Sequence, residues 1–179
     1  APLLAYECWR EFVPKSCGKC VDSVEVRIDS EDPYNKVGEI QAKGYSLMSG
    51  YYKNEEATKA AFTEDGWMRT GDLGLLDAKG NIFIKGRSKN MILSANGQNI
   101  YPEEIEAVVN NQPYVVESVV VDRGARLVAL IYMDSEKAKS EGVDLEEYKK
   151  TIMTEVNRSM PAYSKVNLVE YMDQPFEKT

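Results

Sequence analysis

An aspartate and an arginine flank a segment that is typical of a β-hairpin. Asp72 comes just before the apolar run 73–76, and Arg87 follows the run 81–85, so antiparallel pairing brings the two side chains to one end. A carboxylate there can accept both hydroxyls of a ribose, and a guanidinium can donate to a hydroxyl or a phosphate oxygen. The pair therefore indicates a sugar-phosphate site. An ordinary surface ion pair is the other interpretation that the spacing allows.

The composition excludes several kinds of catalysis and partner. The chain has no histidine, which rules out Ser-His-Asp and Cys-His chemistry within it. Cys17 and Cys20 have the CxxC spacing of a redox pair or half a zinc site, but no second CxxC or histidine completes four ligands. We therefore expect no metal site. The net charge of −7 argues against binding nucleic acid.

Length and hydropathy point to a folded protein of the cytoplasm. The 179 residues, 43% of them hydrophobic, suffice for one domain or two small ones, and leave the oligomeric state open. No run approaches the roughly 20 apolar residues of a membrane helix, and the start lacks a secretion signal. The sequence therefore predicts a cytoplasmic protein with no transmembrane segment.

The first half of the chain reads as short strands between turn residues. The segments 24–28 and 39–42 alternate apolar and polar side chains, and the runs 73–76 and 81–85 should pair as a hairpin across the turn 77–80. Asn54 is placed to cap a short helix that ends near Phe62. Residues 1–88 are therefore expected to form a β-rich unit.

The second half alternates helices with strands. Asn96 and Gly97 predict a tight hairpin turn, Pro102 begins a helix, and Asp144 caps a longer helix that stops before Pro161. Strands are expected at 115–121, 127–133 and 165–171. Residues 89–179 should thus form a small α+β domain with a three-stranded sheet and packed helices. The fold class of the whole chain is α+β.

Four motifs resemble those of the adenylate-forming superfamily, in its order and approximate spacing. They are Gly50–Thr58, Asp65–Gly74, Gly86–Ile92 and Asn99–Glu106. The resemblance covers nearly the whole chain and is to the C-terminal portion of AMP-forming acyl-CoA synthetases. The segment Pro2–Ile28 looks most like bacterial long-chain fatty acid-CoA ligases.

The resemblance implies roles for individual residues. Asp72 resembles the carboxylate that binds the ribose, and Arg87 the arginine that contacts the ribose and phosphate of ATP or AMP. Ile84 falls where the family places a side chain near the nucleotide, although its alternation equally suits a strand core. Lys89 occupies the hinge position. Gly97 lies in a loop that resembles the lining of the tunnel for coenzyme A, and a plain hairpin glycine is the alternative.

The implied reaction has two steps. A fatty-acid carboxylate attacks ATP to give an acyl-adenylate and pyrophosphate, and the thiol of CoA then displaces AMP. No histidine is needed, since the carboxylate is already ionised near neutral pH. The small domain turns about the hinge between the steps.

By the same resemblance, other parts of the machinery fall outside the sequence. The phosphate-binding loop and the magnesium ligand are expected before Ala1, and the adenylation lysine is expected beyond Thr179, so no catalytic residue is assigned here and Lys178 does not take that role. The chain alone is expected to be inactive as a ligase. Two other functions stay open: an adenylation domain that loads a carrier protein, and a non-catalytic nucleotide-binding or interaction module on the same scaffold.

Overall fold

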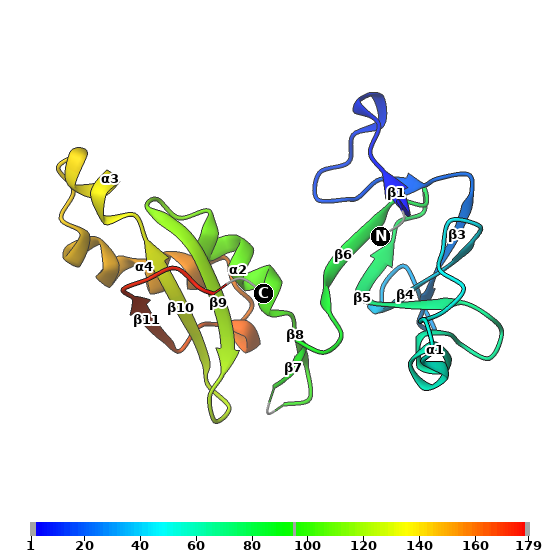
Figure 1. Cartoon of the computed structure of the whole chain (residues 1–179). Helices are drawn as coiled ribbons and strands as arrows, with labels where there is room; N and C mark the ends of the chain where they lie inside the picture. The colour runs from blue at the N-terminus through cyan, green and yellow to red at the C-terminus, as the bar shows by residue number, and fades with distance from the viewer. Residues whose placement is uncertain (1–2, 95, 178–179) are drawn as a thin grey trace. The chain divides into compact units, whose positions relative to one another are not determined.

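The computed structural model describes residues 3–94 and 96–177, and the chain divides into two compact units, Ala1–Lys89 and Asn90–Thr179 (Figure 1). Both units combine antiparallel strands with short connections, and the second adds packed helices. The α+β fold class predicted from the sequence is confirmed. Each unit has its own hydrophobic cluster.

The first unit is built on a four-stranded antiparallel sheet in the order β3-β4-β5-β6. Its elements are β1 (Ala5–Tyr6), the 3-10 helix Trp9–Glu11, β2 (Lys19–Cys20), β3 (Val24–Asp29), β4 (Gly38–Gly44), α1 (Glu55–Ala61), β5 (Met68–Leu76) and β6 (Ile82–Arg87). Ile28, Ile40 and Ile82 form the core of this sheet. The strand β5 begins at Met68, so Asp72 lies inside the strand and not just before it, as the apolar pattern suggested.

Local hydrogen bonds explain where α1 begins. The Asn54 side chain accepts a hydrogen bond from the Ala57 backbone N–H at 2.9 Å, which satisfies one of the free donors of the first turn. The predicted cap is therefore confirmed. The helix ends at Ala61, where Phe62 returns to an extended backbone.

An arginine at the surface of the same sheet is held from three sides. Arg27 forms two hydrogen bonds with the Asp65 carboxylate, at 2.6 and 3.1 Å, and its guanidinium lies 4.6 Å from the ring centre of Trp67. Its Nε also donates to Gln41. The hydrogen bonds from Arg27 lower the pKa of the Asp65 carboxyl to about 2. The contribution of this carboxylate to stability is therefore present above about pH 4 and is lost as the pH falls toward 2.

The second unit is a three-stranded sheet with helices packed on it. Its elements are β7 (Ile92–Leu93), β8 (Asn99–Ile100), α2 (Pro102–Asn110), β9 (Val115–Asp122), β10 (Leu127–Met133), α3 (Ser135–Ser140), α4 (Leu145–Ser159), the 3-10 helix Ala162–Ser164 and β11 (Leu168–Met172). The sheet order is β11-β10-β9, with β10 parallel to β11 and antiparallel to β9. The helices α2 and α4 lie on the same side of this sheet (Figure 1).

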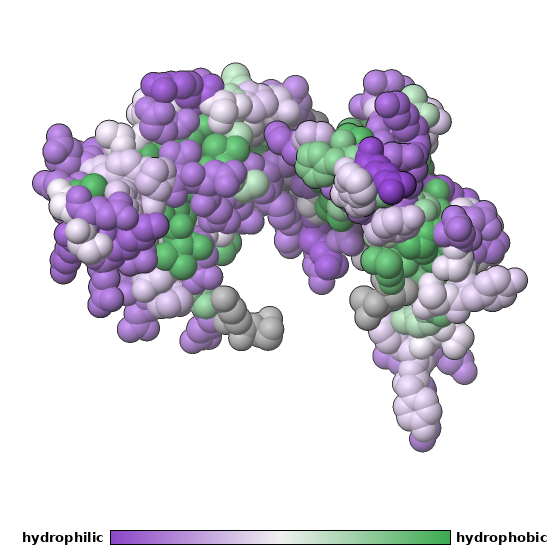
Figure 2. All heavy atoms as spheres, turned by 90° about the horizontal axis from the view of Figure 1, so that it is seen from above, coloured by the Kyte–Doolittle hydropathy of each residue, from purple (hydrophilic) through white to green (hydrophobic). Residues whose placement is uncertain are grey.

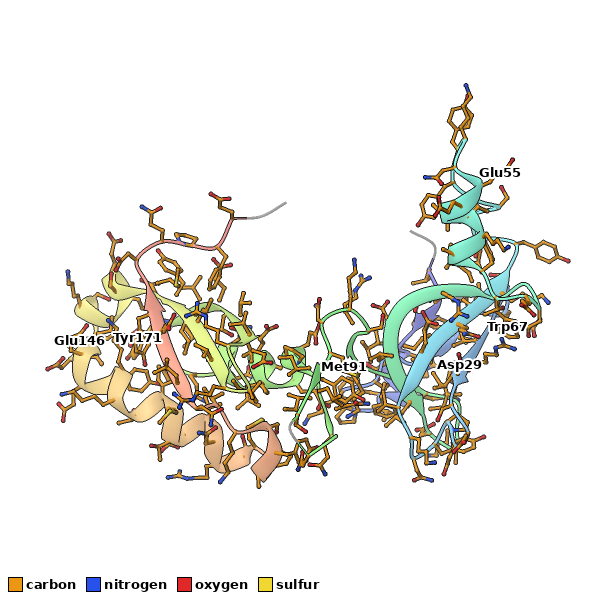
Figure 3. All side chains as sticks on the ribbon, turned by 90° about the horizontal axis from the view of Figure 1, so that it is seen from below. Asp29, Glu55, Trp67, Met91, Glu146 and Tyr171 are labelled. Carbon is orange, nitrogen blue, oxygen red and sulfur yellow. The ribbon has the colours of Figure 1, made fainter. Side chains whose placement is uncertain are left out.

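Apolar residues at helical spacing form the core of the second unit. Ile105 and Val109 of α2 and Ile152 and Val156 of α4 are almost completely buried against Ile131 of the central strand. The spacing of these residues is the pattern that predicted the two helices. Tyr171 of β11 donates to the Lys149 carbonyl and lies beside the first turn of α4, which holds Glu146 (Figure 3).

The third strand begins later than the sequence suggested. The expected range was 165–171, whereas β11 covers Leu168–Met172. Residues 162–164 form a 3-10 turn, and Asn167 then joins the sheet, its backbone N–H donating to the Leu127 carbonyl and its side chain accepting from the Leu127 N–H. This side-chain hydrogen bond precedes the first residue pair of β10 and β11, Val128–Leu168.

The helix α2 also covers the outer edge of β9. The Glu106 carboxylate accepts a hydrogen bond from the Val120 N–H at 2.8 Å, and the Asn110 side chain accepts one from the Ser118 hydroxyl at 2.8 Å. Burial raises the pKa of Glu106, and the nearby charge of Glu103 adds to this effect. This half-buried carboxylate therefore holds α2 against β9 through its hydrogen bond, while its ionised form opposes folding.

The Glu106→Gln variant is expected to melt a few degrees higher than wild type at pH 7 and at nearly the same temperature at pH 4. The folded state holds the proton of Glu106 more tightly than the unfolded state, so stability falls as the pH rises above about 4.5. Glutamine keeps the acceptor for Val120 and cannot ionise. Thermal melting followed by circular dichroism at the two pH values measures this. The exposed Glu136→Gln is the control, and an equal change in both variants would contradict the assignment.

One face of the molecule is mainly polar. On the face shown in Figure 2, hydrophilic side chains predominate and apolar residues appear in small patches between them. Within residues 3–94 and 96–177, every helix is too short or too polar to span a bilayer.

The three cysteines are free thiols. Cys20 packs against the core of the first sheet, and burial raises the pKa of its thiol. In the part of the chain that the structure describes, no cluster of three His, Cys, Asp or Glu residues could hold a metal ion.

Candidate functional site

The structure brings Asp72 and Arg87 together as direct cross-strand partners of β5 and β6. Arg87 Nε lies 2.9 Å from Asp72 Oδ1, and the side chains are 54% and 31% exposed. An ion pair this exposed contributes at most about 1 kcal/mol to folding. Both side chains are therefore accessible to a ligand, and folding depends little on them.

Two irregularities in the sheet surround this pair. Between the β4–β5 pairs Glu39–Leu73 and Gln41–Arg69, the three residues 70–72 face Ile40 alone. A second register shift follows on the other side, where Leu73 pairs with Gly86 but Gly74 pairs with Ile84. Such bulges bend a strand and redirect its side chains, and they are frequent beside functional sites. Nothing in the sequence pattern predicted them.

Hydrogen bonds hold the bulged segment in place. The Thr70 hydroxyl donates to the Ile40 carbonyl at 2.7 Å and accepts from the Asp72 N–H at 3.0 Å. Gly71 has a backbone φ of +74°, which favours glycine, and its N–H donates to Glu39 Oε1 at 3.3 Å. Thr70 and Glu39 are thus parts of the site for which the sequence suggested no role. Their contribution depends on strand register, which has no signature of its own in the sequence.

Ile84 lies on the surface and not in the core. It is 50% exposed, whereas Ile82 two residues earlier is 3% exposed. Its cross-strand partner is Gly74, which has no side chain to cover it, so the strand-core interpretation of Ile84 is wrong. Along the β5–β6 ladder, the Gly74–Ile84 pair is the second pair after Asp72–Arg87, with the register shift between them.

Lys89 is exposed in the turn that follows β6, and the division between the two compact units falls directly after it. The Ser88 N–H donates to the Gly71 carbonyl at 2.9 Å, within the first unit. The Asn90 side chain donates to Glu103 Oε1 at 2.9 Å, within the second unit. Among the described residues, Lys89 itself takes part in no hydrogen bond or ion pair. Hydrogen bonds therefore hold the residue before Lys89 to the first unit and the residue after it to the second unit.

Gly97 lies in the exposed turn between β7 and β8. Its φ is +79°, an added Cβ would meet nothing within 4 Å, and its N–H donates to the Ser94 carbonyl at 2.9 Å. Ser94 and Gln98 close the turn with three further hydrogen bonds between them. Ala95 of this predicted loop lies outside the described residues. The geometry accounts for Gly97 as a hairpin glycine and leaves room beside its backbone.

A cavity of about 290 Å³ adjoins this loop, wholly within the second unit. Three segments line it: the β7–β8 hairpin, the β9–β10 connection and the stretch 162–167. The lining residues are Ile92, Leu93, Ser94, Asn96, Ile100, Asp122, Ala125, Leu127, Ala162, Tyr163, Lys165 and Asn167. The cavity therefore offers apolar surface together with one charge of each sign, Lys165 and Asp122.

Comparison with known proteins finds relatives that are similar to more than half of this chain. The sulfoacetate–CoA ligase of Cupriavidus necator is 44% identical over 106 residues, which are 56% of this chain and 21% of that protein. The nonribosomal peptide synthetase btyA of Aspergillus terreus is 39% identical over 102 residues, 54% of this chain and 11% of that protein. The long-chain-fatty-acid–CoA ligase FadD15 of Mycobacterium tuberculosis is 40% identical over 120 residues, 66% of this chain and 19% of that protein. The chain thus spans about a fifth or less of these relatives.

Solved structures share the fold. The ATP-bound MatB from Rhodopseudomonas palustris is 30% identical with a TM-score of 0.74, covering 93% of this chain and 33% of that one. The O-succinylbenzoate CoA synthetase from Bacillus subtilis in complex with AMP is 28% identical with a TM-score of 0.76, covering 92% and 33%. Residues 89–179 match the family described as the AMP-binding enzyme C-terminal domain. The chain therefore belongs to the AMP-binding enzymes, and its residues 89–179 are a C-terminal domain of that family.

Proposed function

We propose that this chain is part of an AMP-forming CoA ligase. Such an enzyme joins a carboxylate to ATP, giving an acyl-adenylate and pyrophosphate, and then transfers the acyl group to CoA with release of AMP. The observation that carries the proposal is the exposed Asp72–Arg87 pair on a doubly bulged hairpin, in a chain of the AMP-binding family. Solved relatives with ATP or AMP bound support a nucleotide as the ligand.

In this proposal the hairpin binds the nucleotide. Asp72 accepts hydrogen bonds from the ribose hydroxyls, and Arg87 donates to the ribose and the phosphate, where charge builds up as pyrophosphate leaves. Ile84 supplies apolar contact from the exposed surface of the same hairpin.

Lys89 is the proposed pivot between the two steps. The hydrogen bonds of Ser88 and Asn90 tie the chain to the first and second unit respectively, which leaves the backbone torsions at Lys89 free to change. A few torsions at the end of an element suffice for rotation of a domain. The boundary between residues 1–88 and 89–179 is accordingly proposed as the boundary between the large and the mobile domain.

The loop around Gly97 is the proposed path of CoA. A glycine without a neighbour beside its α-carbon lets a thin pantetheine chain pass close to the backbone. Of the two charged side chains that line the adjoining cavity, Lys165 and Asp122, the lysine could pair with a phosphate of CoA.

The proposed substrate is a long-chain fatty acid, supported by the similarity to FadD15. The sulfoacetate ligase among the relatives shows that the shared region occurs with other carboxylates. The second candidate function, loading of a carrier protein, is favoured by the similarity to the peptide synthetase btyA. The complete protein should therefore be assayed for AMP formation with fatty acids of several lengths, with either free CoA or a carrier thiol as acceptor. Product with the carrier alone would reject the CoA-ligase proposal.

The 179-residue chain alone is expected to give no acyl-CoA above a no-protein control. The hairpin supplies groups for the ribose and one phosphate, which is too little to orient both substrates and stabilise the transition state. AMP release in the presence of ATP, fatty acid and CoA is the measurement, with the complete ligase as positive control. Turnover by the chain itself would contradict this prediction.

A further inference from the structure

Glu39 lies next to the bulge that carries Asp72. It belongs to β4, pairs with Leu73 of β5, and its side chain is only 18% exposed. Its two oxygens have different partners: Oε1 accepts from the Gly71 N–H at 3.3 Å, and Oε2 accepts from Arg69 at 2.9 Å. The carboxylate therefore bonds both to Arg69, which directly precedes the bulge, and to Gly71 at the centre of the bulge.

The bulge explains why the Gly71 backbone needs a side-chain acceptor. Three residues of β5 face one residue of β4, so the regular ladder lacks carbonyls for all of their N–H groups. The Asp72 N–H instead donates to the Thr70 hydroxyl, and the Gly71 N–H donates to the Glu39 carboxylate. A backbone donor that is partly shielded from water loses free energy when it has no partner.

The direction of the Asp72 carboxylate depends on this arrangement. Gly71, the residue before it, has a positive φ, and the peptide that follows sets where the Asp72 side chain points. The Gly71 carbonyl also accepts the Ser88 N–H at 2.9 Å, one residue beyond Arg87. Gly71 therefore bonds on one side to Glu39 of β4 and on the other to Ser88, the residue after β6.

We propose that Glu39 is a positioning residue for nucleotide binding: through the Gly71 N–H it fixes the backbone that orients Asp72 toward the ribose. The inference rests on the proposed function, since it assigns Glu39 a role at the nucleotide site. The competing explanation is that Glu39 is only the ion-pair partner of Arg69. The two explanations differ in what the carboxylate must provide, an acceptor for Gly71 or a charge for Arg69.

Substitutions in the complete ligase separate these requirements. Glu39→Gln keeps an acceptor for Gly71 and removes the charge, Glu39→Met keeps the length and removes the acceptor, and Arg69→Met removes only the ion pair. The matched control is Glu31→Met, which removes an exposed carboxylate paired with Lys36 at 2.8 Å elsewhere in the same unit. Glu39→Leu is a second acceptor-free variant if Glu39→Met is too unstable to measure.

Two readouts are expected to change together. In Glu39→Met the hydrogen exchange of the Gly71 amide should accelerate about tenfold, and the dissociation constant for AMP should rise about tenfold, as for the loss of one hydrogen bond. Glu39→Gln, Arg69→Met and Glu31→Met should stay within about threefold of wild type in both.

The outcomes distinguish the possible failures. An equal loss in Arg69→Met and Glu39→Met would overturn the proposal in favour of a simple ion pair. Faster exchange at Gly71 with unchanged AMP affinity would overturn the link to nucleotide binding. An unchanged AMP affinity in Asp72→Ala would reject the proposed function itself, whatever Glu39 does.

Discussion

Replacing Asp72 with alanine in the complete ligase is expected to lower kcat/KM for ATP by a factor of about 10² to 10³. The carboxylate is proposed to accept two ribose hydroxyls, and hydrogen bonds to a charged group contribute about 1.5 to 3 kcal/mol each, part of which water restores. Asp72→Asn keeps one acceptor and should show a smaller loss. Pyrophosphate release at varied ATP concentration measures the effect.

Stability should hardly change in the same variant. Both members of the Asp72–Arg87 pair are substantially exposed, so loss of the pair costs at most about 1 kcal/mol. Asp65→Ala is the matched control, because it removes another exposed Asp–Arg pair of the first unit. A similar loss of ATP use in both variants, or none in Asp72→Ala, would argue against ribose binding by this residue.

Lys89→Pro is expected to leave adenylate formation within about threefold of wild type and to reduce thioester formation by about 10² or more. Proline fixes φ and restricts the preceding residue, so the torsions on which rotation depends can no longer change. The substitution costs no hydrogen bond in the described structure, because the Lys89 N–H makes none there. Pyrophosphate release and acyl-CoA yield are measured on the same preparation.

Lys89→Ala is the control for this experiment. Alanine removes the charge and leaves the torsions free, so both steps should proceed at nearly the wild-type rate. Equal losses of both steps in Lys89→Pro would contradict a hinge role, as would a selective loss of thioester formation in Lys89→Ala.

The sequence predicted the parts of the fold that depend on local patterns. Alternation on both sides of the turn at 77–80 placed β5 and β6, and with them the meeting of Asp72 and Arg87. Helical spacing and caps placed α2 and α4, since Pro102 and Asp144 start these helices by local chemistry. Such features need no knowledge of distant contacts.

The remaining features depend on how strands meet. The bulges beside Asp72 result from the register of three strands, and the exposure of Ile84 depends on its having a glycine as its cross-strand partner. The late start of β11 likewise results from the bond between Asn167 and Leu127. These contacts join residues that are far apart in the sequence, so no local pattern of residue types predicts them.

The cover that α2 provides along β9 affects how the protein meets other chains. A bare strand edge is a template on which another chain can add a strand, the first step of fibre-like aggregation. At Val120 the backbone N–H is already engaged by Glu106, and nearby the Ser118 hydroxyl donates to Asn110. The carboxylate that weakens folding at neutral pH thus helps to keep this sheet from growing beyond its three strands.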